Sequence, residues 1–185
     1  MTEFEKMMNG QPFNGAAEEL SAIRDRAFEL VQQINQSRRF GPTQSLFAEL
    51  FGALGEGSLI RPPFQCEFGQ TVRIGRNTFI NTGVVMLDGA ELTLGDNVMV
   101  GPSVQFYTAS HSLNHLERRN WETHCRPIRV EDDVWIGGNA VINQGVTIGA
   151  RSVVAANSVV NQDVPPDCLV GGTPARILKR LAKSC

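Results

Sequence analysis

The sequence lacks several features that define whole classes of proteins. No apolar stretch is long enough to span a membrane, and the first ten residues are acidic and polar, where a signal peptide would be basic and then apolar. There is no basic run either, and the net charge of -2 argues against binding to nucleic acid. We therefore expect a cytoplasmic protein with neither a membrane nor a nucleic-acid partner.

Cysteine is scarce and widely scattered along the chain. The four cysteines form no CxxC pair and stand at Cys66, Cys125, Cys168 and Cys185. This spacing favours free thiols in a reducing compartment over a disulfide framework or a zinc site. The sequence thus predicts neither structural disulfides nor a required metal.

What the chain does contain is a repeat of six residues. A fixed short period fits neither a long helix nor a long strand. It predicts a mainly β fold, a parallel β-helix of short strands with one large side chain per repeat in its interior. The large residues are Ile74, Ile80, Met86, Leu94, Val100, Phe106, Val130, Ile136, Ile142, Ile148, Val154 and Val160. Four positions after each stands a smaller companion: Thr78, Val84, Ala90, Val98, Val104, Ser110, Val134, Ala140, Val146, Ser152, Ser158 and Val164.

Glycine often follows directly after a large repeat residue. The five such positions are Gly75, Gly95, Gly101, Gly137 and Gly149. Because glycine tolerates the positive φ that tight corners need, we expect these residues to form the corners of the coils. We place the β-helix at residues 58–170, and the polar, charged segment 108–126 within it as an inserted loop.

Different patterns flank the repeats. In residues 1–57, apolar side chains at helical spacing from Leu20 to Ile34 predict an amphipathic helix. A second, shorter helix is expected from about Thr43 to Leu54, and together they form a helical cap over the first coil. Residues 171–185 contain apolar and basic residues side by side, which predicts a short basic helix or arm.

Reactive chemistry is expected where the repeat breaks, because inward aliphatic side chains carry no reactive group. His111 follows the last residues of a coil, and a histidine anchored there suits a general base near neutral pH. A solvated loop histidine remains the alternative, as it is for His115 and His124. His111 and His115 are four residues apart, but no carboxylate or cysteine has matching spacing, so no metal site is predicted.

Five segments of the chain resemble the maltose and galactoside O-acetyltransferases of the hexapeptide-repeat superfamily. They are NTG at 81–83, YTASH at 107–111, VWIGG at 134–138, AVIN at 140–143 and GGTPAR at 171–176. The resemblance covers nearly the whole chain. It implies a left-handed β-helix, a homotrimer with active sites between adjacent subunits, and transfer of acetyl from acetyl-CoA to a hydroxyl of a sugar such as maltose, glucose or a galactoside.

The resemblance also assigns catalytic roles. The histidine matching His111 removes the proton from the sugar hydroxyl, which attacks the thioester directly, and the asparagine matching Asn81 stabilises the oxyanion and orients the acceptor. A general base contributes about 10²–10⁴-fold to the rate. An amide donor aimed at the developing charge adds about 3 kcal/mol. On residue type alone, Asn81 would be an asparagine at a turn.

By the same resemblance, CoA should lie along the later coils. Trp135, Gly138 and Ala156 would line the path of the pantetheine arm, and Arg176 and Lys179 would lie near the phosphates. Trp135 would also suit packing at a subunit boundary.

Several residues depart from the family pattern. Asn161 and Gln162 stand where relatives commonly have Thr-Lys, so a cation expected near a CoA phosphate is missing. On the acceptor side, Glu67 matches a position that is often Asp or Ser. Small residues replace acidic sugar ligands at three further positions, Gly15, Ala17 and Gly89. The resemblance therefore leaves the identity of the acceptor open.

Two other functions are compatible with the repeats. A hexapeptide-repeat enzyme of another chemistry, such as a γ-carbonic-anhydrase-like hydratase, would need histidines that converge from neighbouring coils, whereas all three histidines here lie in one loop region. A catalytically silent trimeric binding scaffold would not need His111. The sequence favours the acetyltransferase.

Overall fold

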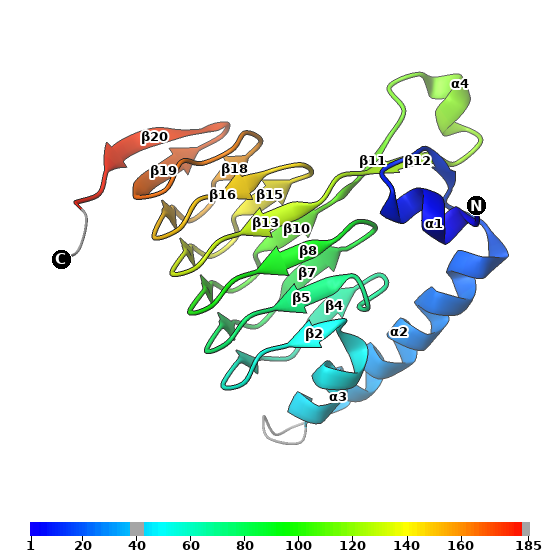
Figure 1. Ribbon diagram of the computed structural model, residues 1–185, viewed down its shortest axis with the longest axis horizontal. Helices are drawn as coiled ribbons and strands as arrows, with labels where there is room; N and C mark the ends of the chain where they lie inside the picture. Colours follow the sequence, from blue (N-terminus) through cyan, green and yellow to red (C-terminus); the bar gives the residue numbers. More distant parts are fainter. Residues whose placement is uncertain (38–42, 183–185) are drawn as a thin grey trace.

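The body of the molecule is a left-handed parallel β-helix with three walls (Figure 1). The computed structural model describes residues 1–37 and 43–182. The first wall consists of β2 (Ala53–Leu54), β5 (Val72–Ile74), β8 (Leu92–Leu94), β13 (Ile128–Val130) and β16 (Thr147–Ile148). The second consists of β3 (Leu59–Ile60), β6 (Phe79–Ile80), β9 (Met99–Val100), β14 (Trp135–Ile136), β17 (Val153–Val154) and β19 (Cys168–Gly172). The third consists of β4 (Phe64–Cys66), β7 (Val84–Leu87), β10 (Gln105–Tyr107), β15 (Val141–Asn143) and β18 (Val159–Val160).

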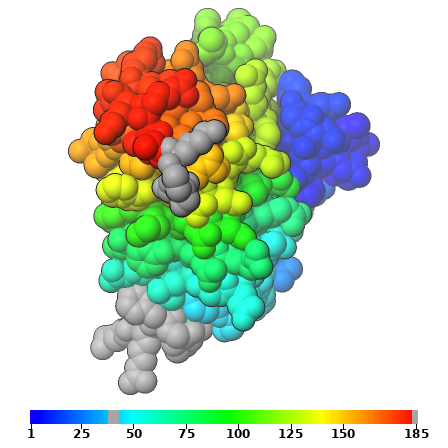
Figure 2. All heavy atoms as spheres, turned by 60° about the vertical axis from the view of Figure 1, so that its left-hand side comes forward, coloured from blue at the N-terminus to red at the C-terminus, as the bar shows by residue number. Residues whose placement is uncertain are grey.

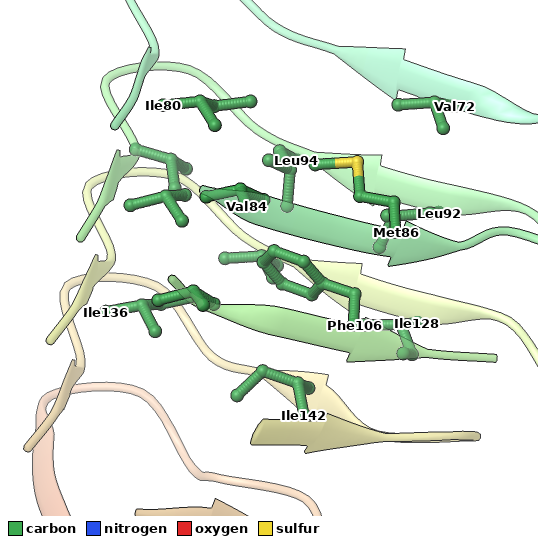
Figure 3. Packing of buried hydrophobic residues seen from close by; sticks show 14 of the residues in the cluster. Val72, Ile80, Val84, Met86, Leu92, Leu94, Phe106, Ile128, Ile136 and Ile142 are labelled. Carbon is green, nitrogen blue, oxygen red and sulfur yellow. The ribbon is translucent and has the colours of Figure 1, made fainter. Parts of the chain in front are cut away.

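The large repeat residues fill the interior, as the sequence predicts. On the third wall, Met86, Phe106 and Ile142 are register partners in consecutive coils, so their side chains stack. Every large repeat residue from Ile74 to Val160 is at most 3% exposed. Figure 3 shows side chains from all three walls pointing into this one core. Burying one such side chain stabilises the fold by about 1.5–3 kcal/mol, so each coil contributes to the stability of the stack.

Two of the smaller companions lie outside this core. Ala90 is buried, but it packs in a second apolar cluster with Phe68 and Cys125. Ser110 is half-buried on a strand that has already left the third wall. At Ala90 the sequence itself slips by two residues, because the next large repeat residue after Met86 is Leu94. At Ser110 the period of six continues in the sequence, although the chain departs from the solenoid after Tyr107.

The five glycines that follow repeat residues have a different role from the one predicted. None of them has a positive φ. A Cβ on Gly137 would lie 2.5 Å from the backbone nitrogen of Ala156 in the next coil, and one on Gly75 would lie 2.5 Å from the carbonyl oxygen of Gly95. These glycines are therefore required by the close approach of adjacent coils. Positive φ occurs instead at polar corner residues such as Asn97 (φ 57).

The N-terminal helices close the first coil and reach beyond it. They are α1 (Glu3–Met8), α2 (Glu18–Gln36) and α3 (Thr43–Leu50). Ile34 of α2 and Phe47 of α3 are fully buried in the solenoid core, whereas Leu20 of α2 belongs to the second cluster. The solenoid begins at Ala53 and not at residue 58, because β2 pairs with β5. Leu54 fits the helical spacing of the preceding segment, which explains the late boundary.

The predicted loop 108–126 is an ordered hairpin. It contains β11 (Ala109–His111), α4 (His115–Arg118) and β12 (Glu122–Cys125), and β12 also pairs with β1 (Phe13–Asn14) near the N-terminus. Figure 1 shows the hairpin extending away from the coils. In Figure 2 the N-terminal residues, in blue, stand out from the side of the stacked coils. The N-terminal segment and the hairpin thus form one unit.

The C-terminal segment is not a helix. It forms β20 (Ala175–Arg180), which pairs antiparallel with β19 and extends the second wall. The basic residues Arg176, Lys179 and Arg180 on this strand fit an exposed edge of the sheet. Cys66, Cys125 and Cys168 are free thiols, while Cys185 lies outside the described residues. Within residues 1–37 and 43–182, no helix has the length and apolar character needed to cross a membrane.

Candidate active site

A pocket of about 360 Å³ lies where the hairpin meets the N-terminal segment and the end of the third wall. We call it the hairpin pocket. Its lining includes Arg24, Glu67, Gly89, His111, Trp121 and Cys125. The structure thus brings together His111 and Glu67, two of the predicted site residues, from distant parts of the sequence.

His111 is exposed on the hairpin and is held by one backbone contact. Its Nδ1 lies 3.3 Å from the carbonyl oxygen of Glu122. Because a carbonyl only accepts hydrogen bonds, this contact places the proton of the neutral ring on Nδ1. Nε2 then keeps its lone pair, so the imidazole can accept a proton there, as a general base must.

Glu67 forms an ion pair with Arg24 from α2. The Glu67 Oε1 atom accepts a hydrogen bond from Arg24 Nε at 2.7 Å, and each side chain is 28% exposed. Arg24 also donates from Nη1 to the carbonyl oxygen of Gly15 and lies 4.8 Å over the ring of Phe68. These contacts fix the carboxylate at the pocket wall, where its second oxygen can accept from a bound hydroxyl.

Asp88 is a fully buried carboxylate that holds the turn after β4. It accepts backbone hydrogen bonds from Glu67, Phe68 and Gly69 at 2.7–3.0 Å, and one from the Thr71 hydroxyl at 2.7 Å. It therefore positions Glu67 without lining the pocket itself. The sequence pattern gave no signal for Asp88 or Arg24, because buried charges and their partners depend on tertiary contacts.

Small residues leave room for side chains of the hairpin at the base of this pocket. A Cβ on Gly89 would lie 2.6 Å from Cys125 Sγ, and one on Gly15 would lie 2.9 Å from Thr123 Oγ1. Burial, with the Glu67 carboxylate nearby, raises the pKa of the Cys125 thiol to about 12. The thiol is therefore neutral near pH 7 and unsuited to act as a nucleophile.

A second pocket, of about 510 Å³, lies on the outer face of the second wall. We call it the wall pocket. It is lined by Asn81, Met99, Trp135, Gly138, Ala156 and Leu169 among others. Four predicted residues, Asn81, Trp135, Gly138 and Ala156, thus meet in one place. The outward side chains of Met99 and Trp135 are paired in register and form an apolar row beside small residues.

The amide of Asn81 is oriented by a local contact. Its Oδ1 accepts the backbone N–H of Thr82 at 2.8 Å and lies 3.5 Å from Arg61 Nη1. A backbone N–H can only donate, so the oxygen must be the atom on this side. The Nδ2 group of Asn81 donates to no described residue, and it is free to donate toward a ligand in the wall pocket.

The remaining predicted ligands lie outside both pockets. Arg176 and Lys179 are exposed on β20, one strand beyond Leu169 of the wall pocket. Asn161 and Gln162 are exposed after β18, at the corner between the third and first walls. Within this one chain, Asn161 and Gln162 therefore do not lie together with Trp135.

Neither His115 nor His124 lines the hairpin pocket. His115 begins α4, and His124 Nε2 lies 3.9 Å from a carboxylate oxygen of Glu122. Among the described residues, no three His, Cys, Asp or Glu side chains are grouped so that they could hold a metal ion.

Comparison with known proteins identifies the family to which the chain belongs. Residues 6–55 match the maltose acetyltransferase hexapeptide capping motif, and residues 127–162 match the hexapeptide repeat of succinyl-transferase. The chain is 35% identical to the galactoside O-acetyltransferase of Escherichia coli, over 96% of this chain and 88% of that protein. The chain belongs to the hexapeptide-repeat acetyltransferases.

Solved structures agree with this membership. A hexapeptide-repeat acetyltransferase from Vibrio cholerae, complexed with acetyl-CoA, is 64% identical with a TM-score of 0.93, over 99% of this chain and 100% of that one. A maltose O-acetyltransferase from Clostridium difficile is 33% identical with a TM-score of 0.97, over 99% of both chains. The family resemblance and the left-handed β-helix expected of this acetyltransferase are thereby confirmed.

Proposed function

We propose that this acetyltransferase moves the acetyl group of acetyl-CoA to a hydroxyl of a sugar. The main observation in support of this proposal is the hairpin pocket, where His111 and the Glu67 carboxylate face one small cavity. The names of the similar galactoside and maltose enzymes support a sugar as acceptor. The acetyl-CoA complex of the similar Vibrio cholerae enzyme supports acetyl-CoA as donor.

The reaction needs one proton acceptor and one oxyanion donor. His111 Nε2 takes the proton of the sugar hydroxyl, and the hydroxyl oxygen attacks the thioester carbonyl carbon of acetyl-CoA. The negative charge that develops on the carbonyl oxygen is stabilised by the Nδ2 donor of Asn81. The C–S bond then breaks, and the imidazolium returns the proton to the CoA sulfur, so that an acetyl ester and free CoA are formed.

The proposed site takes residues from two subunits. His111 and Asn81 line different pockets of one chain, at different corners of the solenoid. One strand of the third wall, β7, separates these corners by roughly 10–15 Å at about 3.3 Å per residue. A base and an oxyanion donor that act on one acetyl transfer must both lie within hydrogen-bond reach of the reacting atoms. A homotrimer with active sites between subunits satisfies this requirement.

CoA fits the wall pocket in this proposal. Its pantetheine arm would lie along Trp135, Gly138 and Ala156, where small residues let an extended chain approach the wall. Arg176 and Lys179 would lie near the phosphates, and Asn161 and Gln162 would come from the neighbouring subunit. We also place the enzyme in the cytoplasm, since its three described cysteines are free thiols.

Glu67 would select the acceptor by accepting hydrogen bonds from its hydroxyl groups. Gly15 and Gly89 leave the base of the hairpin pocket to Thr123 and Cys125, which carry no charge at neutral pH. This leaves Glu67 and its partner Arg24 as the charged pair of the hairpin pocket.

The first test is release of free CoA thiol from acetyl-CoA in the presence of glucosyl, galactosyl and maltosyl acceptors. Acetylation of at least one sugar is expected. No release with any of these acceptors would contradict a sugar acceptor.

A second test addresses the shared site. His111→Ala and Asn81→Ala subunits, each inactive alone, are co-expressed with different affinity tags, and mixed trimers are purified. If one site uses His111 of one subunit and Asn81 of its neighbour, each mixed trimer has one intact site. The purified mixed trimers should then recover about a third of wild-type activity, because one of their three sites is intact. No recovery would show that both residues must come from one chain.

A further inference from the structure

Trp121 has an unusual backbone for its size. Its φ is 58°, in the left-handed region that bulky side chains rarely adopt. It lies between α4 and β12, at the point where the hairpin returns toward the solenoid. Its side chain is 61% exposed and lines the hairpin pocket together with His111.

The backbone of Trp121 is held from two sides. Its carbonyl oxygen accepts hydrogen bonds from the backbone N–H of Gly15 at 3.4 Å and from Thr123 Oγ1 at 2.9 Å. Any residue would supply this carbonyl, and glycine would adopt this φ without strain. The turn therefore does not account for the indole, and strained residues of this kind cluster at ligand sites.

The chemistry of the hairpin pocket suits an aromatic platform. One side carries the ion pair of Glu67 and Arg24, which can bind hydroxyl groups. The indole of Trp121 adds a broad apolar surface to the same cavity. A pyranose ring matches this arrangement, because its hydroxyls lie at the rim and its axial C–H groups form an apolar face. C–H groups carry partial positive charge and pack favourably on the negative face of an aromatic ring.

We propose that Trp121 is a specificity-determining residue that stacks on the apolar face of a pyranose acceptor and turns one ring hydroxyl toward His111. The inference rests on the proposed sugar acetyltransfer and adds the residue that recognises the apolar face of the acceptor ring. Trp121 is thus a binding residue of the acceptor, whereas Glu67 binds the polar rim.

Steady-state kinetics of Trp121→Gly test this directly, because glycine keeps the left-handed backbone. The KM for the best pyranosyl acceptor should rise about tenfold or more, since an aromatic contact and its buried area are lost. The KM for acetyl-CoA should stay unchanged. A linear polyol such as sorbitol, which has no ring face, is the matched control and should lose much less. Trp121→Phe should recover part of the affinity. Equal losses for ring and linear acceptors, or an unchanged KM for the ring, would overturn the proposal.

The two tryptophans of the chain allow a binding test without turnover, because Trp121 lines the hairpin pocket and Trp135 the wall pocket. In Trp135→Phe, Trp121 is the only tryptophan, and its emission should shift on titration with the pyranosyl acceptor. In Trp121→Phe, the emission of Trp135 should respond to CoA and not to the sugar. No response of Trp121 to the sugar would overturn the stacking role.

Two further outcomes distinguish the stacking role of Trp121 from the proposed sugar acetyltransfer and from a role of Trp121 in assembly. If wild-type protein acetylates no sugar while the emission of Trp121 still responds to one, the proposed function fails and the stacking role stands. If Trp121→Gly sediments as a monomer while the wild type is a trimer, Trp121 holds subunits together and the proposal is wrong.

Discussion

The wall pocket and the hairpin pocket differ in how many parts of the chain build them. The wall pocket repeats two positions of consecutive coils, a row of apolar residues such as Met99 and Trp135 and a row of small ones such as Gly101. The hairpin pocket is assembled from β1, α2, the corners after β4 and β7, and both strands of the hairpin. Of these two pockets, as far as the structure describes their lining, the hairpin pocket alone contains an ion pair.

This difference suggests a division of labour. A repeated wall gives an even, mostly apolar groove, which suits an extended arm that is held along its length. A pocket in which several segments converge can place directional groups such as His111 and Glu67 around one point. We therefore expect changes in the two pockets to have separable effects on the two substrates, and the following experiments test this, from the largest effect to the smallest.

Both pockets are built on coils whose side chains stack in one core. Ile142→Asp should prevent folding, because an unpaired charge would enter a fully buried ladder between Phe106 and Val160. Soluble yield and a thermal melt by circular dichroism measure the effect. Arg129→Asp, on the exposed side of the first wall, is the control and should melt cooperatively. A soluble Ile142→Asp protein with a cooperative melt would contradict the register of the core.

His111→Ala should remove the proposed general base from the hairpin pocket. Turnover should fall by about two to four orders of magnitude, the usual loss for a general base, while the affinity for acetyl-CoA stays nearly the same. Kinetics at saturating acetyl-CoA measure this against the best acceptor. His115→Ala and His124→Ala are matched controls, since neither residue lines the pocket. An equal loss in His115→Ala would mean that the base is misassigned.

Deleting the chain after Gly172 should weaken the binding of acetyl-CoA at the wall pocket and leave the hairpin pocket unchanged. The deletion removes β20 with Arg176 and Lys179, so acetyl-CoA binding should weaken about tenfold while the assembly state stays that of the wild type. Calorimetric titration gives the Kd, and sedimentation gives the assembly state. The double variant Arg176→Ala/Lys179→Ala keeps the strand and separates charge from structure. An unchanged Kd in both proteins would remove these two residues from the CoA site.

Gln162→Lys should produce the smallest change, a gain. A lysine at this exposed position would add the cation that the family pattern has near the CoA phosphates, and the Kd for CoA should fall about two- to fivefold. The gain should shrink at high salt, because exposed charges are screened. Gln162→Ala is the control and should leave the Kd as it is. A Kd that does not respond to Gln162→Lys at low salt would separate Gln162 from the phosphates.

Much of the architecture could be predicted from the sequence. The period of six identifies the inward residues from Ile74 to Val160 because each repeat makes the same corner and the same contact with its neighbours. The helix from Leu20 to Ile34 followed from its spacing for the same local reason. The residues of the wall pocket share one outer face of the solenoid, so their meeting is a consequence of that repeat.

Only the tertiary structure decided the rest. It showed that Arg176 and Lys179 lie on a strand, because β19 offers an unpaired edge that a short apolar and basic segment can join. It also brought Arg24, Glu67 and Trp121 to the same pocket as His111, from helix, corner and hairpin, with the turn at Glu67 held by the buried carboxylate of Asp88. The sequence by itself determined the repeated coils, since each depends on its own residues and its immediate neighbours. The hairpin pocket depends on contacts between segments far apart in the chain, and no local period encodes such contacts.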